Sequence, residues 1–573
     1  MAPLSVKSIS ESLDISSTVL LNTLILGGVI LVLVTITAYY KYATNRNSSI
    51  TICKVPGALP FIGNPFGGVG DIYTTLEKWA DEQYASGNKS GAYECSLLGD
   101  RHVILCNEKT VSFIERQRPF KVERMGSVDR ALKSCGVDGL FAAEGEFWKK
   151  DRRIVAPHLN HKNVNDYMRF VQIVTKRLMH KWEENMRVAK NIENGCGATI
   201  NISPDLVATS MDIISLVAFA KDVDTLQKGD RGMGEDIKNL LEKIMFRALF
   251  PFPYWDIPIV GQYLDGCGWT ASRMKRAFRD VIEEHESSTS SNIADHTSPS
   301  GKVSELDNGM VDEGGNVIER HRYKSFLGKI ITQSKRENTS FLTTDRLIGN
   351  LITMFIAGTE TSAVTMNVCL YQIAIDNTGL QEELAAESCA LPDLKEDIDM
   401  EVLNEKLPRL RSLMYEVLRI KGPSPFLEVE NKVSVEIDGK VQPPNTKMFM
   451  LLQYISTLES SEVGKRTPRG PRNSPPSDFC PRRWLLSNPE GSNEPVSAIK
   501  PTFKTGFRPF GSGMRVCPGK DFAEVEMLMV LSSILRTFEI VGLQDDHPPL
   551  KHVIRFTQAP DVDIHLVLKP RKN

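Results

Sequence analysis

The sequence predicts one large, mainly α-helical domain with a small β-sheet region, preceded by a membrane-spanning helix. Long stretches of the 573 residues carry apolar side chains at helical spacing, whereas strand-like alternation is confined to a few short segments. The composition, 41% apolar and 24% charged, is that of a globular chain with ample material for a core. An uncharged apolar run near the N-terminus adds the membrane segment.

The membrane segment is residues 19–40, with the sequence VLLNTLILGGVILVLVTITAYY. About 20 such residues span a bilayer as a helix, and Tyr39 and Tyr40 stand where an interfacial aromatic belt forms. No A-x-A cleavage pattern follows the run, which favours an uncleaved anchor over a signal peptide. A mitochondrial leader is Arg-rich, whereas the first arginine here is Arg46, so the sequence disfavours that interpretation.

The charges that flank this run predict its orientation. Only Lys7 precedes it, whereas Lys41, Arg46 and Lys54 follow, and positive residues stay on the cytoplasmic side. We therefore expect residues 1–18 to form a short lumenal tail and the rest of the chain to face the cytosol. Residues 41–66 form a basic linker rich in Pro and Gly, and residues 67–573 form the folded domain.

Helices dominate the expected domain. Apolar spacing predicts them at 166–187, 235–248, 269–286, 344–375, 401–420 and 521–538. Strand-like patterns lie at 93–98, 102–106, 433–437, 447–452 and 563–568. Two segments, 287–315 and 459–478, are rich in small and polar residues, which predicts flexible insertions.

Charge and cysteine usage exclude several classes of protein. Lys and Arg total 69 against 71 for Asp and Glu, and a net charge of −2 argues against a nucleic-acid partner. The ten cysteines form no CxxC pair, so they signal neither a zinc site nor a thioredoxin-like motif. In a chain of this length they predict no disulfide framework. We expect most of them to be small buried hydrophobic residues in a reducing compartment.

One cysteine stands in a different context. Residues 507–519 read FRPFGSGMRVCPG, and their glycines and prolines predict a tightly turned loop. Cys517 therefore lies just before the helix expected at 521–538, where backbone N–H groups, the helix dipole and Arg515 are expected to lower the pKa of a thiol. A lone cysteine is more often a buried structural residue than a functional one. The residues around Cys517 therefore have to distinguish the two possibilities.

That pattern resembles the haem-binding loop of the cytochrome P-450 family, of the microsomal, membrane-anchored type. The matching residues are Phe510, Gly513, Arg515, Cys517 and Gly519. The resemblance implies that Cys517 is the axial thiolate ligand of heme b (iron protoporphyrin IX). It also implies that Phe510 covers the sulfur and that the glycines let the backbone approach the haem. The implied fold buries the haem between a long central helix and the cysteine loop.

A Glu-x-x-Arg pair supports the resemblance. Glu416 and Arg419 share one helix face, but such pairs are common on helix surfaces and by themselves indicate nothing. In the family this pair bonds an arginine in a Phe-x-Pro-x-Arg-Trp stretch. Residues 479–484 match that stretch, with Arg483 as the third member and Arg482 where the family often has Glu. The resemblance implies a buried structural ion network.

The helix expected at 344–375 carries Ala357-Gly358-Thr359-Glu360-Thr361 in its middle. Ala357, Gly358 and Thr361 share a face, and small residues beside a hydroxyl leave room for a ligand. The stretch resembles the family's oxygen-binding segment, in which the Thr hydroxyl and the neighbouring acid, here Thr361 and Glu360, deliver protons as general acids. The alternative is a threonine that bonds only the carbonyl four residues earlier.

Trp148 and Arg152 resemble the family's Trp-x-x-x-Arg motif, which implies that both donate to a haem propionate, with Arg515 as a further candidate. The family often has another Arg or His where this chain has Val429, so one propionate contact is expected to be missing. Basic residues are expected to cluster near the cysteine and to dock an acidic reductase, or to form only a solvated basic face. They are Lys149, Lys150, Arg153, Lys504 and Lys520.

The resemblance implies a monooxygenase that inserts one atom of O₂ into a hydrophobic lipid, sterol, terpenoid or xenobiotic. The electrons would come from NADPH through a diflavin reductase, with cytochrome b5 as an additional candidate donor, at the endoplasmic reticulum membrane. The alternatives are a haem-thiolate isomerase or dehydratase acting on lipid hydroperoxides without a reductase, and a non-catalytic haem-binding membrane protein. Five aromatic residues and three prolines in 249–264 suggest an apolar lid that touches the membrane, or else a packed connector.

Overall fold

The computed structural model describes residues 52–59, 63–65, 71–87, 90–97, 100–188, 197–229, 232–250, 253–258, 261–295, 324–336, 343–396, 398–457, 474–485 and 507–572. The expected lumenal tail, the membrane helix at 19–40 and most of the linker lie outside these residues, so they remain predictions. The same holds for 296–315 and 458–473, which make up most of the two expected insertions.

Helices form most of the described chain. Their bounds are α2 (Ile72–Ala85), α3 (Glu108–Gln117), α4 (Gly126–Ser134), α5 (Gly145–Val155), α6 (His161–Val164), α7 (Met168–Val188), α8 (Ile202–Phe219), α9 (Thr225–Lys228), α10 (Met233–Leu249), α11 (Cys267–Asp295), α13 (Phe326–Arg336), α14 (Thr344–Ala374), α15 (Leu380–Cys389), α16 (Met400–Lys406), α17 (Pro408–Lys421), α18 (Leu452–Thr457) and α20 (Lys520–Thr537).

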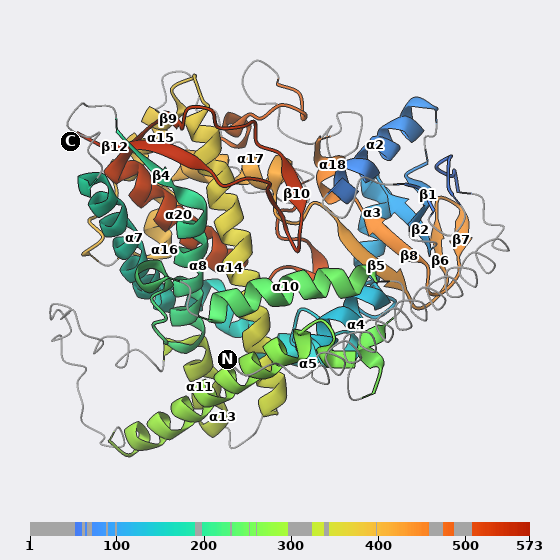
Figure 1. The fold of residues 1–573 in the computed structure, drawn as a ribbon, viewed down its shortest axis with the longest axis horizontal. Coiled ribbons are helices and arrows are strands. Elements are labelled where there is room, and N and C mark those ends of the chain that lie inside the picture. The colour runs from blue at the N-terminus through green and yellow to red at the C-terminus, as the bar shows by residue number, and fades with distance from the viewer. Residues whose placement is uncertain are drawn as a thin grey trace, which may run out of the picture.

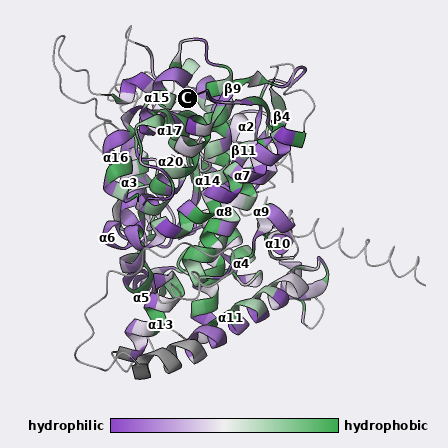
Figure 2. Ribbon diagram, turned by 90° about the vertical axis from the view of Figure 1, so that its left-hand side faces the viewer, coloured by the Kyte–Doolittle hydropathy of each residue, from purple (hydrophilic) through white to green (hydrophobic). Residues whose placement is uncertain are grey.

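The long helix α14 runs through the middle of the helical part, with α8 packed along it and α17 and α20 also in contact (Figure 1). Thr343 caps its first turn through a hydrogen bond from the backbone N–H of Arg346. Apolar residues concentrate along α14 and α8 (Figure 2). In the described part of the chain these two helices are long and apolar enough to cross a membrane, but both are mostly buried inside the fold.

The five-stranded sheet and the β6–β7 pair lie at the right of Figure 1, away from most of the helices, whereas β4, β9 and β12 lie at the upper left, against the helices. A five-stranded sheet has the order β1-β2-β8-β5-β3, and smaller sheets have the orders β4-β12-β9, β10-β11 and β6-β7. The bounds are β1 (Ala92–Leu97), β2 (Asp100–Leu105), β3 (Val122–Arg124), β4 (Ala198–Asn201), β5 (Leu427–Asn431), β6 (Val435–Ile437), β7 (Lys440–Gln442), β8 (Lys447–Met450), β9 (Phe538–Leu543), β10 (His552–Ile554), β11 (Gln558–Pro560) and β12 (His565–Pro570).

The mainly helical architecture with small sheets confirms the expected fold class. Two of the expected boundaries are wrong. The helix expected at 401–420 is two helices, α16 and α17, because Pro408 cannot donate the backbone bond that a continuous helix needs there and instead begins α17. The insertion expected from residue 287 begins later, because α11 continues to Asp295.

Candidate cofactor and active site

The cysteine loop has the turned conformation that its glycines predict. Gly511 and Gly513 have φ angles of +74° and +63°, a region that residues with a Cβ rarely adopt. The backbone N–H of Cys517 donates to the carbonyl of Phe510 at 2.9 Å, which closes the loop. Helix α20 begins three residues later, at Lys520, and Cys517 is an exposed residue. The loop therefore presents an accessible sulfur just before a helix.

The titration of Cys517 differs from the expectation. Although Cys517 is exposed, the protein atoms around its thiol displace part of the water, and this desolvation raises the pKa of the free thiol. The effect outweighs the hydrogen bond from Gly519 and the charges of Arg152 and Lys520, which lower the pKa. The expected depression of the pKa by the protein alone is therefore wrong. A metal ion that binds a thiol displaces its proton directly, so the thiolate depends on the metal rather than on the helix end.

Helix α5 supports the cysteine loop. Arg152 donates to the carbonyl of Val516 at 2.8 Å, one residue before the cysteine. Trp148 is buried, and the guanidinium of Arg515 lies 4.8 Å from the centre of its ring. Arg515 also pairs with Glu144, which precedes α5. The structure thus brings Arg152 against the cysteine loop and Trp148 against Arg515, while their role toward a haem propionate stays a prediction.

Two further arginines complete this group. The charge of Arg118 acts on both Arg124 and Arg515, and the charge of Arg515 acts on Arg124, so the three side chains lie close together. Burial lowers the pKa of Arg124 and of Arg515 to about 10. The Nε–H groups of all three side chains are buried and have no hydrogen-bond partner among the described residues. A buried donor without an acceptor is costly, so the three groups together indicate an acceptor that the protein does not supply.

The carboxyl groups beside these arginines do not balance their charge. Glu144 is paired with Arg515, and Glu115, which also acts on Arg118, is paired with Arg508. Glu428 faces Arg124, but burial raises the pKa of Glu428 to about 7, so it carries only part of a negative charge at neutral pH. The site therefore has an excess of positive charge that fits an anionic ligand.

No local sequence motif marks Arg118 or Arg124 as part of this site. The sequence shows only that Val429 stands where a cationic contact is expected. In the structure β3 pairs with β5 so that Arg124 lies directly opposite Val429. Residues that face each other across paired strands project to the same side of the sheet. Arg124 therefore supplies, from the neighbouring strand, the positive charge that position 429 lacks. Only the pairing of the strands reveals this relation.

The middle of α14 departs from the burial of the rest of the helix. Ala357 is exposed, and Gly358 and Thr361 are half-buried, within a helix that is otherwise mostly buried. The Thr361 hydroxyl donates to the Ala357 carbonyl at 2.7 Å. This is the bond to the carbonyl four residues earlier that the sequence offered as the alternative to a role in proton delivery. A Cβ on Gly358 would lie 2.9 Å from the side chain of Ile214 on α8, so packing against α8 requires this glycine.

Glu360 is placed as a protonatable group. Burial raises the pKa of its carboxyl, against the lowering effects of Thr557 and Arg555 in the turn between β10 and β11. Its Oε2 atom is buried and lacks a hydrogen-bond partner among the described residues. A carboxyl with a raised pKa next to a threonine hydroxyl is an arrangement typical of general acid–base groups.

The predicted Glu-x-x-Arg network is confirmed. Glu416 and Arg419 are joined by two hydrogen bonds of 2.7 and 2.9 Å, and Arg483 reaches Glu416 at 3.0 Å. All three side chains are fully buried. Trp484 Nε1 and the backbone N–H of Cys480 also donate to Glu416, each at 2.8 Å. The network fixes the stretch 479–484 against α17.

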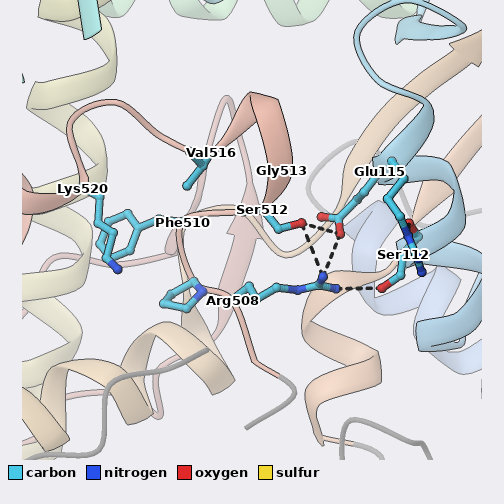
Figure 3. A pocket seen from close by; sticks show the side chains of 11 residues that line it. Ser112, Glu115, Arg508, Phe510, Ser512, Gly513, Val516 and Lys520 are labelled. Carbon is cyan, nitrogen blue, oxygen red and sulfur yellow. Dashed lines mark hydrogen bonds and ion pairs between the residues drawn. The ribbon is translucent and has the colours of Figure 1, made fainter. Parts of the chain in front are cut away.

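A cleft of about 440 Å³ lies between α3 and the cysteine loop (Figure 3). Arg508 spans it, donating to Ser112 at 3.2 Å and pairing with Glu115 at 3.2 Å. Ser512 donates to the same carboxylate at 2.8 Å. Phe510, Gly513, Val516 and Lys520 line the remaining wall. These contacts anchor the loop to α3, in addition to its contacts with α5.

These residues fit a haem group. Among the described residues no three His, Cys, Asp or Glu side chains gather into a metal-binding group, so the ligand that this loop offers a metal is one thiol, as an iron held in a porphyrin requires. The partnerless arginine N–H groups match the two carboxylates that such a group carries.

Comparison with known proteins agrees with this assignment. Residues 56–562 match the family described as Cytochrome P450, so the chain belongs to the cytochrome P450 family. It is a haem-thiolate enzyme of the monooxygenase class, with the oxidoreductase activity that the family shares.

Individual relatives are distant. The chain is 24% identical to cytochrome P450 3A13 of Mus musculus, over 89% of this chain and 90% of the relative. It is 22% identical to the bifunctional cytochrome P450/NADPH–P450 reductase ALT2 of Alternaria alternata, over 91% of this chain but only 40% of that protein. The crystal structure of a cytochrome P450, CYP102L1, has a TM-score of 0.64 at 19% identity and covers 91% of this chain and 99% of that one, which shows the shared fold.

Proposed function

We propose that this protein is a membrane-bound monooxygenase that inserts one oxygen atom from O₂ into a hydrophobic substrate with electrons from NADPH. The observation that carries the proposal is the accessible Cys517 sulfur beside a group of arginines whose N–H donors lack partners. When haem is bound, it supplies the oxygen chemistry. The test is substrate-dependent NADPH oxidation with product formation in the presence of a diflavin reductase. Turnover of a lipid hydroperoxide without reductase would contradict it.

The haem is held by three sets of residues in this proposal. Cys517 is the axial ligand, and Phe510, Gly513 and Gly519 shape the loop around its sulfur. Trp148, Arg152 and Arg515 hold the propionate edge, together with Arg118 and Arg124. Charge-assisted bonds from guanidinium groups to carboxylates are the strongest available in this site. They also supply the acceptors that the partnerless Nε–H groups need.

Arg124 can be tested separately from activity. Arg124→Leu should speed the loss of haem to an excess of apomyoglobin by at least tenfold, because one charge-assisted contact of about 1.5–3 kcal/mol is lost. Arg130→Leu, an exposed arginine on the nearby helix α4, is the control and should release haem at the wild-type rate. The double variant Arg124→Leu with Val429→Arg should recover slow release. Release unchanged by Arg124→Leu would contradict the assignment.

Residues in the middle of α14 are proposed to deliver protons. Burial raises the pKa of Glu360, which favours its protonated form relative to an exposed glutamate. Thr361 lies one residue further, with an accessible hydroxyl, and the exposed Ala357 leaves space beside it. In this proposal Glu360 passes protons inward and Thr361 orients their transfer during oxygen cleavage, while Gly358 lets α8 approach the helix.

The substrate chamber is proposed to be apolar. Phe141 and Phe556 are only partly buried, and their rings are 6.0 Å apart. Phe556 sits in the turn whose neighbour Thr557 faces Glu360. Such walls bind lipids, sterols, terpenoids or xenobiotics through apolar contact. A lipid-library screen for spin-state shifts of the purified ferric protein identifies the class, and Phe556→Ala should weaken those shifts.

A reductase docking surface is proposed on α5. Lys149, Lys150 and Arg153 are exposed there, and Phe147 is 72% exposed among them. A basic rim around an apolar residue suits an acidic flavin domain or cytochrome b5. Lys150→Glu should raise the reductase concentration needed for half-maximal rate, most strongly at low salt. Lys395→Glu, a charge change in a different segment, is the matched control; equal effects of both would contradict the surface.

A second membrane contact is proposed around the connection between α10 and α11. Within the apolar segment 249–264, Tyr254 and Trp255 are buried, so these two aromatic residues do not offer the membrane contact. Other apolar side chains in this segment and beside it are exposed. They are Phe246, Ile257, Tyr263, Leu264 and Trp269, exposed by 43–64%. Together with a helix at 19–40 they would place the catalytic domain on the cytosolic face of the endoplasmic reticulum.

Truncation tests both contacts. Removal of residues 1–42 should leave part of the protein on membranes, because the exposed apolar group still partitions into the interface. Adding Leu264→Ser and Trp269→Ser should then release most of it. Unchanged integral behaviour after truncation would contradict the anchor, and full solubility after truncation alone would contradict the second contact.

A further inference from the structure

Two cysteines far apart in the sequence meet inside the fold. The Sγ atoms of Cys135 and Cys267 are 2.7 Å apart, and both residues are completely buried. Cys135 caps the C-terminal end of α4, and Cys267 is the first residue of α11. The sequence predicts no disulfide here. We propose that this pair is a dithiol site that closes to a disulfide in the presence of hydrogen peroxide and thereby ties α4 to α11.

The backbone on each side shapes this meeting. Gly136 follows the first cysteine and Gly266 precedes the second, and both have φ angles of +79°. A side chain is strained in that conformation. A Cβ on Gly136 would also lie 2.9 Å from the Lys275 side chain on α11, so the end of α4 approaches α11 closely. The two tight turns therefore hold the cysteines face to face without a covalent bond.

A buried arginine polarises the pair. Arg247 on α10 is fully buried and donates to Asp265 through Nε and Nη2, each at 2.8 Å. It also donates to the hydroxyl of Ser134, at 2.8 Å. The hydrogen bond from the Cys267 thiol and the charge of Arg247 lower the pKa of Cys135 despite its burial. One sulfur is thus the more nucleophilic and the other remains protonated, the asymmetry of an attacking and a resolving cysteine.

The chemistry balances with peroxide as the oxidant. The Cys135 thiolate attacks one peroxide oxygen, the O–O bond breaks, and hydroxide leaves as a sulfenic acid forms. The Cys267 thiol then attacks that sulfur, the S–O bond breaks, and the second oxygen leaves as water with the thiol proton. Two thiols and one hydrogen peroxide give one disulfide and two waters. A small oxidant is required, because neither residue has exposed surface that a bulky disulfide could reach.

Thiol mapping of the full-length, haem-loaded protein tests the proposal. The reduced protein is treated with a few equivalents of peroxide, quenched with catalase, denatured and alkylated with iodoacetamide. We expect two fewer alkylated thiols than in the untreated protein and a peptide that joins positions 135 and 267. Cys369→Ser, which removes another fully buried cysteine on α14, should behave as the wild type. Both Cys135→Ser and Cys267→Ser should abolish the loss of two thiols.

Three outcomes of the thiol mapping overturn the proposal. They are full alkylation of both cysteines after oxidation, pairing of either with a different cysteine, and an unchanged loss of two thiols in both serine variants. If a serine variant fails to fold, the wild-type peptide map decides alone. Hydrogen exchange adds a second measurement. Amides around 134–136 and 265–267 should exchange more slowly in the oxidised wild type than in the reduced wild type. In Cys267→Ser, peroxide treatment should leave the exchange rate of these amides unchanged. Equal exchange in oxidised and reduced wild type refutes the tether.

Discussion

The buried Glu416–Arg419–Arg483 network makes a prediction that depends on its charge balance. One carboxylate stands between two guanidinium groups, all fully buried. Arg419→Ala leaves a neutral pair of Glu416 and Arg483, so the loss comes mainly from two buried carbonyls that lose their donor, those of Ser456 and Pro476. The Asp478 carbonyl, which also accepts from Arg419, keeps a hydrogen bond from Arg483 at 2.9 Å. At about 1–3 kcal/mol for each unsatisfied group, and with the buried ion pair broken, the cost is about 3–5 kcal/mol.

Glu416→Ala should be worse, because it leaves two buried positive charges facing each other without a counter-ion. The cost then approaches the whole stability of a typical domain, about 5–15 kcal/mol. We expect no haem-loaded protein from Glu416→Ala. We expect a population of unfolded Arg419→Ala that is on the order of a hundredfold to several thousandfold larger than in the wild type.

A matched control lies on α7, where Glu184 and Arg187 form the same Glu-x-x-Arg spacing at 3.3 Å on the surface, 54% and 72% exposed. Such a pair contributes about 0–1 kcal/mol. Urea titration read by pulse proteolysis, with haem content per protein, gives the ranking Glu416→Ala, then Arg419→Ala, then Arg187→Ala. An Arg419→Ala protein as stable as Arg187→Ala would refute the reasoning.

Three other outcomes can be checked. Cys517→Ser should remove the thiolate-type red shift of the Soret band in the reduced carbon monoxide complex, whereas Cys480→Ser should keep it; a mutant that retains the shift contradicts the ligand assignment. Thr361→Ala should keep NADPH oxidation but yield more hydrogen peroxide and less product, and an unchanged product-to-NADPH ratio leaves Thr361 with only its helix bond. Burial raises the pKa of Glu526 from 4.5 to about 8, so the folded state keeps a proton that the unfolded state releases, and stability should fall as pH rises between those values. Glu526→Gln should flatten that part of the curve of unfolding free energy against pH; an unchanged slope contradicts the assignment.

The sequence predicted the helical fold and the linear motifs well, because their evidence is local. The cysteine loop, the Glu-x-x-Arg pair and the middle of α14 each lie within a few consecutive residues whose spacing decides the geometry. The prediction of one long helix at 401–420 was wrong, because the apolar periodicity continues across Pro408 although the chain begins a new helix there. Periodicity alone therefore overestimates helix length at such a proline.

Strand pairing was the part that local patterns could not provide. Strands β3 and β5 are short and contain glutamates, so neither alternates clearly, and they lie about three hundred residues apart. The same limit hid the role of Arg124. Loop composition was also a poor guide near one end of the segment 459–478, which was expected to be an exposed insertion. Pro476 in this segment is buried, and its carbonyl accepts a hydrogen bond from Arg419. Amino-acid composition does not predict a single buried hydrogen bond of this kind.

The pairing of Arg124 with Val429 has a consequence for tracing how related chains change. A guanidinium can move between two distant positions of the sequence while staying at nearly the same point in space, because the two positions face each other across adjacent strands. When related sequences are compared at only one of the two positions, such a move of the guanidinium looks like the loss of a cation. Chains of this family that lack a cation at the position equivalent to 429 should therefore tend to carry one opposite it, and the two substitutions should covary.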